Sequence, residues 1–201
     1  LHTWAFDAAD FTARVFFTSA EKGSGKSRAL AVLVALAARV LATAGITAAA
    51  LFRTVAAHRP TLAVDECDTF LKDNEELRGV LNAGFERGGA VVRCVGDDAE
   101  PRRFDCFAPV ALAGIGRLPG TVEDRAIVIP MQRRLPSETV APFRRAERAG
   151  LSDVRRRCAR WAADRLEALK AAQPEVPEAL DDRAADILGP LLAIADVAGG
   201  E

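Results

Sequence analysis

Short apolar runs dominate the first two thirds of the chain. Four of them are rich in β-branched, aromatic or small aliphatic side chains and are bounded by polar or turn-forming residues: 15–18, 61–64, 110–113 and 126–129. Runs of this length are typical of strands that are buried on both faces of a sheet. We predict that they form the core of an α/β fold with a mostly parallel sheet.

Helical and hairpin patterns separate these runs. Residues 27–43 form a long alanine- and leucine-rich stretch that ends before Gly45, and residues 75–87 show an amphipathic pattern. We predict a helix over each of these two segments. Two further runs, at 90–95 and 103–107, flank a turn-rich segment and predict a β-hairpin.

The strand pattern stops near residue 135. Three helical patterns follow it, over residues 140–148, 152–172 and 177–197. We therefore divide the chain into a core over residues 1–134 and a small helical lid over residues 135–201.

The segment after the first predicted strand has the features of a phosphate-binding loop. Residues 20–27 fit the phosphate-loop pattern, except that Ala20 replaces its first glycine. Glycines let the backbone turn its amides toward phosphates, Lys26 adds a positive charge, and the Ser27 hydroxyl can ligate Mg²⁺. A glycine-rich turn that happens to precede a lysine is the alternative. We predict that ATP is bound by Glu21, Lys22, Gly23, Ser24, Gly25, Lys26, Ser27 and Arg28.

An acidic cluster follows the run at 61–64. In P-loop hydrolases a first carboxylate at such a strand end holds magnesium, and a second polarises the attacking water. We predict that Asp65 binds the metal and that Glu66 is the catalytic base, because they follow the phosphate loop by about 40 residues. A solvated acidic strand end is the alternative. The nearby Asp68 either orients this acidic cluster or caps the next helix, and we favour the cap.

Arg125 directly precedes the run at 126–129. In ring-forming ATPases an arginine at this position faces the γ-phosphate held by the neighbouring subunit and stabilises charge in the transition state. We predict this role for Arg125, and a local salt bridge with Glu123 or Asp124 is the alternative.

Other arginines have weaker assignments. Arg133 and Arg134 are secondary candidates for the role of Arg125. Arg183, near the start of the last helical pattern, is expected to reach back from the lid to the bound phosphates. The alternative for Arg183 is an ordinary surface arginine among carboxylates.

The composition excludes some classes of protein but does not indicate a function. Half of the residues are hydrophobic and 27% are charged, which excludes a disordered tail. The formal net charge of -1 gives no overall attraction to nucleic acid, so contacts with DNA must come from local arginine clusters. The four cysteines show no CxxC spacing, which argues for a reducing cytoplasm. We expect no membrane span, and because the chain begins at Leu1 we expect flanking domains.

The order of five segments resembles a family of P-loop ATPases known as domain of unknown function 3631. The segments are Phe-Thr-Ser-Ala-Glu-Lys-Gly-Ser-Gly-Lys-Ser, Gly-Ile-Thr-Ala-Ala-Ala-Leu-Phe-Arg, Pro-Thr-Leu-Ala-Val-Asp-Glu-Cys-Asp-Thr-Phe, Leu-Asn-Ala-Gly and Ala-Gly-Ile-Gly-Arg-Leu-Pro-Gly-Thr-Val-Glu-Asp-Arg. The resemblance includes the last helical pattern and so covers nearly the whole chain. It implies a three-layer core of the additional-strand class, similar to AAA+ proteins and superfamily-three helicases.

The resemblance also implies an ATP- and Mg²⁺-dependent motor in a replication protein of a mobile element, commonly joined to a primase-polymerase domain. We expect a homo-oligomeric ring, such as a hexamer, that acts as a helicase on single-stranded or duplex DNA. Arg93, Arg102 and Arg103 lie on or beside the predicted hairpin, where a ring would present them to a DNA strand in its centre. Arginines that only improve solubility are the alternative.

The chain departs from related motors after the fourth core strand. They usually carry an asparagine or threonine there as a sensor of the γ-phosphate, whereas this chain has Ala-Gly-Ile-Gly at residues 113–116. Either another residue such as Asn82 substitutes, or hydrolysis is coupled differently. A second function class also fits these motifs: an ATP-dependent switch or loader that binds a partner or DNA without unwinding.

Overall fold

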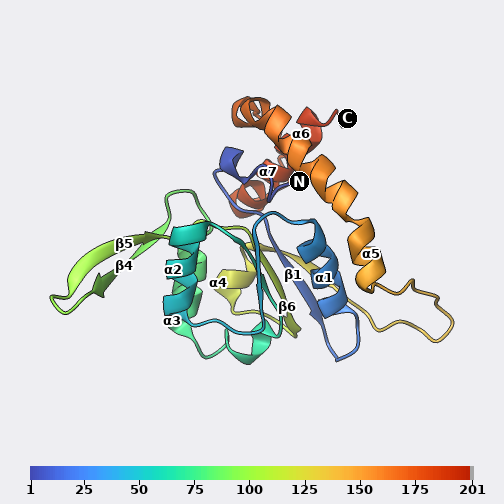
Figure 1. Cartoon of the computed structure of the whole chain (residues 1–201), viewed down its shortest axis with the longest axis horizontal. Coiled ribbons are helices and arrows are strands. Elements are labelled where there is room, and N and C mark those ends of the chain that lie inside the picture. Colours follow the sequence, from blue (N-terminus) through green and yellow to red (C-terminus); the bar gives the residue numbers. More distant parts are fainter. Residues whose placement is uncertain (200–201) are drawn as a thin grey trace.

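The computed structural model describes residues 1–199, with the side chains of all of these except residues 145 and 146. A five-stranded sheet forms the centre of the molecule (Figure 1), with the strand order β2-β3-β6-β1-β7. All four neighbouring pairs in this sheet are parallel. The strands are β1 (Arg14–Ser19), β2 (Val40–Thr43), β3 (Thr61–Val64), β6 (Val110–Ile115) and β7 (Ala126–Pro130). The prediction of an α/β fold with a parallel sheet is therefore confirmed.

Helices cover both faces of the sheet because its strands are apolar on both sides. Phe17 of β1 packs with Leu30 of α1 (Lys26–Leu36) on one face. Phe16, the preceding residue, packs on the other face with the apolar side chains of α2 and α3. This alternation follows from the period of two along a strand. The helices on the second face are α2 (Ala48–His58), α3 (Glu75–Ala83) and the short α4 (Gly120–Glu123), with the 3-10 turn η2 (Cys67–Thr69).

The predicted hairpin is present as a separate two-stranded sheet. It consists of β4 (Ala90–Val95) and β5 (Glu100–Asp105), which pair antiparallel. Figure 1 shows that the hairpin projects away from the rest of the molecule, on the side of α2. Its base is anchored in the core through Phe104, whose ring packs against Phe52 of α2.

Of the three C-terminal helices, the last two pack with the N-terminal segment at the amino ends of the parallel strands, whereas the first lies near the phosphate loop. These helices are α5 (Arg145–Gly150), α6 (Ser152–Ala171) and α7 (Asp182–Val197). Residues of the N-terminal segment, Trp4 and Ala5, pack with Trp161 and Leu169 of α6 and with Ile194 of α7. Figure 1 shows the N-terminus beside α7 for this reason. The boundary after residue 134 stays a prediction, although the N-terminal segment packs with the helices on its far side.

One predicted helix is wrong in part. The stretch 27–43 is not a single helix, because α1 ends at Leu36 and residues 40–43 form the edge strand β2. One contact and one backbone angle explain the break. The Trp4 indole N–H donates to the Leu36 carbonyl at 2.8 Å, and Arg39 has a left-handed φ of 44°, which a helix does not allow. High alanine content favours a helix, but hydrogen bonds to a neighbouring strand can stabilise an extended conformation in its place.

The predicted helix at 75–87 is also shorter than expected, since α3 ends at Ala83. Gly84 follows it at a point where two backbones touch: a Cβ on Gly84 would lie 2.1 Å from the Cys106 carbonyl oxygen. No helix in the part of the chain that the structure describes combines the length and apolar character that a membrane span requires.

We predict that Gly84→Ala lowers the free energy of unfolding by about 3 kcal/mol, because the new methyl group must displace the Cys106 backbone. Gly79→Ala is the matched control, since Gly79 lies inside the same helix and a methyl group there would have no atom within 4 Å. The control should stabilise the protein by up to about 1 kcal/mol. Urea unfolding followed by tryptophan fluorescence measures both, and equal stability of the two variants would contradict the packing argument.

Candidate phosphate-binding site

The phosphate loop connects the end of β1 to the start of α1. Gly23 and Gly25 have φ angles of 79° and 89°, which side chains with a Cβ rarely adopt. Gly25 is the residue before the first turn of α1, which begins at Lys26. The partial positive charge of a helix N-terminus therefore lies at the end of this loop, as an anion-binding site requires.

The Lys26 ammonium lies over the loop and contacts neutral oxygens. It donates to the Ser19 hydroxyl, to the Glu21 carbonyl at 3.2 Å and to the Ser24 hydroxyl at 3.3 Å. No carboxylate of the described residues lies within ion-pair distance of this ammonium. Its charge is therefore not compensated locally and is available to an anion.

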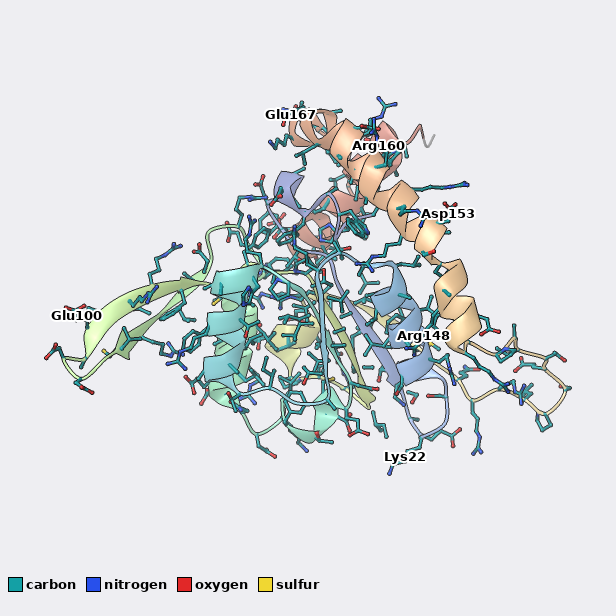
Figure 2. The ribbon with its side chains drawn as sticks, viewed as in Figure 1. Lys22, Glu100, Arg148, Asp153, Arg160 and Glu167 are labelled. Carbon is teal, nitrogen blue, oxygen red and sulfur yellow. The ribbon has the colours of Figure 1, made fainter. Side chains whose placement is uncertain are left out.

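A cavity of about 540 Å³ lies against the loop. It is lined by Gly23, Ser24, Gly25, Lys26, Ser27, Arg28, Ala31 and Arg148. The sequence reasoning missed Arg148, which α5 brings to this cavity; in Figure 2 it lies beside α1, whereas Lys22 points outward at the tip of the loop. Arg28 helps to hold this arrangement, because its guanidinium donates to the Phe143 carbonyl in the segment before α5.

Arg133 also lies at the phosphate loop. Its Nε is 4.0 Å from the position that a Cβ on Gly23 would take. Arg133 is therefore near the loop of its own chain, which differs from the position expected for a residue that reaches a neighbouring subunit. The density of arginines in residues 133–148, directly after the last strand, is the signal that could have identified Arg148 and placed Arg133 at this loop.

Asp65 and Glu66 lie at the same edge of the sheet as the phosphate loop. Because β6 pairs in parallel with both β1 and β3, the carboxyl ends of these strands point the same way, with β1 and β3 about 10 Å apart. The backbone turns sharply here: Glu66 has a left-handed φ of 53°, and its N–H donates to the Asp65 carboxylate at 3.0 Å. Asp65 is half-buried and Glu66 is exposed.

The prediction that Asp68 caps the next helix is wrong. Asn74 caps α3, accepting from the Leu77 N–H at 2.9 Å. Asp68 instead accepts from the Ile115 N–H at 3.0 Å and so ties the acidic turn to the end of β6. Burial and the Asp68 charge raise the pKa of the neighbouring Cys67 thiol to about 12, so this thiol stays protonated and packs as an apolar group.

This contact explains why the chain has glycine at residue 114. A Cβ on Gly114 would lie 2.8 Å from the Asp68 carboxylate and 2.9 Å from the Cys67 sulfur. The space for a side chain at this position is therefore filled from η2. Asn82, the suggested substitute, donates to the Thr121 hydroxyl at 3.1 Å, between α3 and α4.

We predict that Gly114→Ala breaks the hydrogen bond between Asp68 and Ile115 and costs about 1–3 kcal/mol of stability. Amide hydrogen exchange of Ile115, followed by NMR, should become faster than in the wild type. Gly120→Ala, in α4, is the control because its methyl group would meet no atom within 4 Å. Unchanged exchange at Ile115 would show that Asp68 is not held in this way.

Arg125 lies at the opposite edge of the sheet from the phosphate loop of its own chain. The β1–β7 register pairs Ala126 with Arg14, the first residue of β1, whereas the loop follows the last one. The length of β1 separates the two positions by about 17 Å. The alternative for Arg125, a local salt bridge with Glu123 or Asp124, is not formed: Glu123 pairs with Arg117 at 2.7 Å, and Arg125 donates to the Thr121 carbonyl at 2.6 Å.

The structure does not bring Arg183 to the phosphate loop, so the expectation that it reaches its own bound phosphates is wrong. Its guanidinium carbon lies 5.1 Å from the centre of the Phe85 ring, and Arg125 lies 5.7 Å from the same ring. The reason is the packing of α7 against the N-terminal segment, which holds α7 away from the loop. Arg183 also pairs with Asp186 at 3.5 Å.

The three hairpin arginines have different surroundings. Arg93 pairs with Glu76 of α3 at 3.1 Å, and Arg103 pairs with Asp105 at 2.8 Å. Arg102 is exposed and stacks over the Phe104 ring, with no ion pair among the described residues. The structure thus places Arg102 and Arg103 on the surface of a projecting hairpin, and Arg102 has the least compensated charge.

Comparison with known proteins gives one family match and one similar protein, each over about a third of the chain. Residues 130–201 match a family described as "Protein of unknown function (DUF3631)". A Saccharopolyspora erythraea protein, described as "Uncharacterized 28.9 kDa protein in xis 5'region", is 46% identical over 72 residues, which are 35% of this chain. The chain covers 27% of the length of that relative. The family match begins at the last residue of β7, so it includes Arg133 and Arg148 but not the phosphate loop or the turn at Asp65 and Glu66.

Proposed function

We propose that this chain is an ATP-binding and ATP-hydrolysing motor domain. The observation that carries the proposal is the convergence at one sheet edge of the phosphate loop and the turn at Asp65 and Glu66. An additional strand, β6, lies between the strands that end at these two motifs, which is the arrangement expected for P-loop ATPases of the additional-strand class.

The residues at this edge fit ATP and Mg²⁺. The loop supplies positive-φ glycines, an uncompensated ammonium and a helix N-terminus beside a cavity of about 540 Å³. Ser27 and Asp65 would hold Mg²⁺, which usually takes one or two protein oxygens and completes its shell with phosphates and waters.

Each residue of the site has a distinct task in this proposal. Lys26 binds the phosphates, Glu66 orients and polarises the attacking water, and Arg28 and Arg148 add positive charge at the cavity. Mg²⁺ would neutralise the phosphate charge that develops during hydrolysis. Arg125 is too far from its own loop, so it can act only on a nucleotide held by a neighbouring copy. The motor therefore works as a homo-oligomeric ring.

The projecting hairpin supports a role on DNA. Arg102 and Arg103 lie on an exposed β-ribbon that carries two arginines away from the body of the molecule (Figure 1), which suits contact with a phosphate backbone. The nucleotide site and the arginine-bearing hairpin together support a helicase core. We propose that this core belongs to a replication protein of a mobile element and acts with a primase-polymerase domain. The alternative, a switch or loader without unwinding, shares the nucleotide site and differs in its response to DNA.

We predict that Lys26→Ala weakens ATP binding about 100-fold, because it removes a charge-assisted contact of about 3 kcal/mol. Lys22→Ala is the matched control from the same loop, since the Lys22 side chain points into solvent and lines no part of the cavity. Isothermal titration with ATP and Mg²⁺ measures both variants. Equal affinities for the two variants would contradict nucleotide binding at this loop.

We predict that single-stranded DNA stimulates ATP hydrolysis and that Arg102→Ala/Arg103→Ala reduces this response. Removing two phosphate contacts should lower the slope of log affinity against log salt by about 1.4. Arg156→Ala/Arg157→Ala is the control, because both side chains are exposed and paired with Asp153 on α6. Hydrolysis that stays the same with and without DNA, but is abolished by Glu66→Gln, would favour the switch over the helicase.

A further inference from the structure

Three arginines surround a single phenyl ring at the amino edge of the sheet. The guanidinium carbons of Arg14, Arg125 and Arg183 lie 5.5, 5.7 and 5.1 Å from the centre of the Phe85 ring. No two of these carbons can therefore be more than about 11 Å apart. At such separations the three positive charges repel one another, because salt screens charges only over about 8–10 Å and buried charges even less.

Little in the surrounding protein compensates this charge. Arg14 is 1% exposed and donates one N–H to the Leu81 carbonyl, and its Nε and Nη1 have no hydrogen-bond partner among residues 1–199. Arg125 donates to a neutral carbonyl. Only Arg183 has an ion pair among the described residues, a long one of 3.5 Å to Asp186. Leaving a buried cation without an anion is costly, so a cluster of this kind requires an explanation.

The electrostatic effects within the cluster agree with its geometry. Burial, and then the charge of Arg125, lower the pKa of Arg14 to about 9. Burial and the charge of Arg183 lower the pKa of Arg125, and the charge of Asp124 offsets this only in part. An anion that approached Arg125 and Arg183 would relieve the repulsion in all three.

The fold holds the cluster in place from three separate elements. Arg14 begins β1, and the β1–β7 register places Arg125 next to it. Arg183 is in the first turn of α7, whose start is fixed by the Asp181 cap, which accepts from the Ala184 N–H at 2.7 Å. The Phe85 ring packs against Phe11 at 5.4 Å. The fold itself therefore holds the three arginines and the Phe85 ring in place, and the cluster does not depend on a flexible loop.

We propose that Arg125 and Arg183, on the Phe85 ring and in front of the buried Arg14, form a phosphate-binding site at the sheet edge opposite the phosphate loop. We call it the amino-edge site. Both guanidinium groups are partly exposed, and their planar N–H donors match the oxygens of a phosphate group. The buried charge of Arg14 raises the local positive potential without contacting the ligand.

The phosphate can come from two sources. One is the terminal phosphate of a nucleotide held by the phosphate loop of a neighbouring copy, and this source rests on the function proposed above. The other is a free phosphate ion. A nucleotide in the same chain is excluded, because the length of β1 separates the two sites by about 17 Å.

The first test uses Lys26→Ala protein, in which phosphate binding at the phosphate loop is weakened about 100-fold. Inorganic phosphate is titrated while ³¹P line width and thermal unfolding are followed. We expect residual binding that Lys26→Ala/Arg183→Gln weakens at least tenfold and that Lys26→Ala/Arg183→Lys retains in part. Lys26→Ala/Arg157→Gln is the control, because Arg157 is an exposed arginine on α6. Binding that is unaffected by Arg183→Gln would overturn the amino-edge site.

The second test identifies the source of the phosphate by mixing two variants, each of which is impaired at one of the two sites. Lys26→Ala subunits keep the amino-edge site, and Arg183→Gln subunits keep the phosphate loop. Hydrolysis by the mixture well above that of either variant alone supports the neighbour's nucleotide as ligand. Phosphate binding in the first test without such rescue supports free phosphate. If wild-type protein neither binds nor hydrolyses ATP while the first test succeeds, the proposed motor function fails and the amino-edge site stands.

Discussion

The parallel pairing of β1 with strands on both of its sides is the constraint on which the rest of the structure depends. Pairing with β6 places the phosphate loop beside the strand that lies next to the acidic turn, and pairing with β7 places Arg125 beside Arg14. A parallel ladder fixes which strand ends lie side by side. The register of β1 therefore determines which residues meet at the carboxyl ends of the strands and which meet at their amino ends. The apolar residues of β1, packed against α1 on one face and α2 and α3 on the other, hold this register.

Local patterns in the sequence were enough to predict the parts of the fold that local chemistry determines. The apolar runs became strands close to their predicted limits, and the phosphate loop lies between β1 and α1 as its glycines and Lys26 require. The edge strand β2 was missed, because four residues in an alanine-rich stretch have no distinctive period and owe their conformation to β3. Propensity alone cannot indicate which neighbour supplies the hydrogen bonds.

Residues whose roles depend on contacts distant in sequence were the ones misplaced. Asp68 has the spacing of a helix cap, yet its partner is a backbone N–H that is 47 residues away. Arg183 was expected over the phosphates because it belongs to a C-terminal helix, but α7 packs on the N-terminal segment at the other end of the strands. Arg148 reaches the phosphate loop because α5, rather than α7, lies along α1. The side on which a helix packs depends on apolar partners that a linear motif does not contain.

The separation of the two cationic sites has a consequence for assembly. Within one chain the phosphate loop and the Phe85 cluster lie at opposite ends of the same strand, so neither can act on a phosphate held by the other. In the proposed ring, a head-to-tail arrangement of identical copies would bring the phosphate loop of one copy to the Phe85 cluster of the next, and closure would leave no site unpaired. In an isolated chain the cluster carries the repulsion of three guanidinium groups with a single long ion pair among the described residues. Contact with a neighbour's phosphate would convert that repulsion into attraction, so nucleotide binding itself would favour the association of copies.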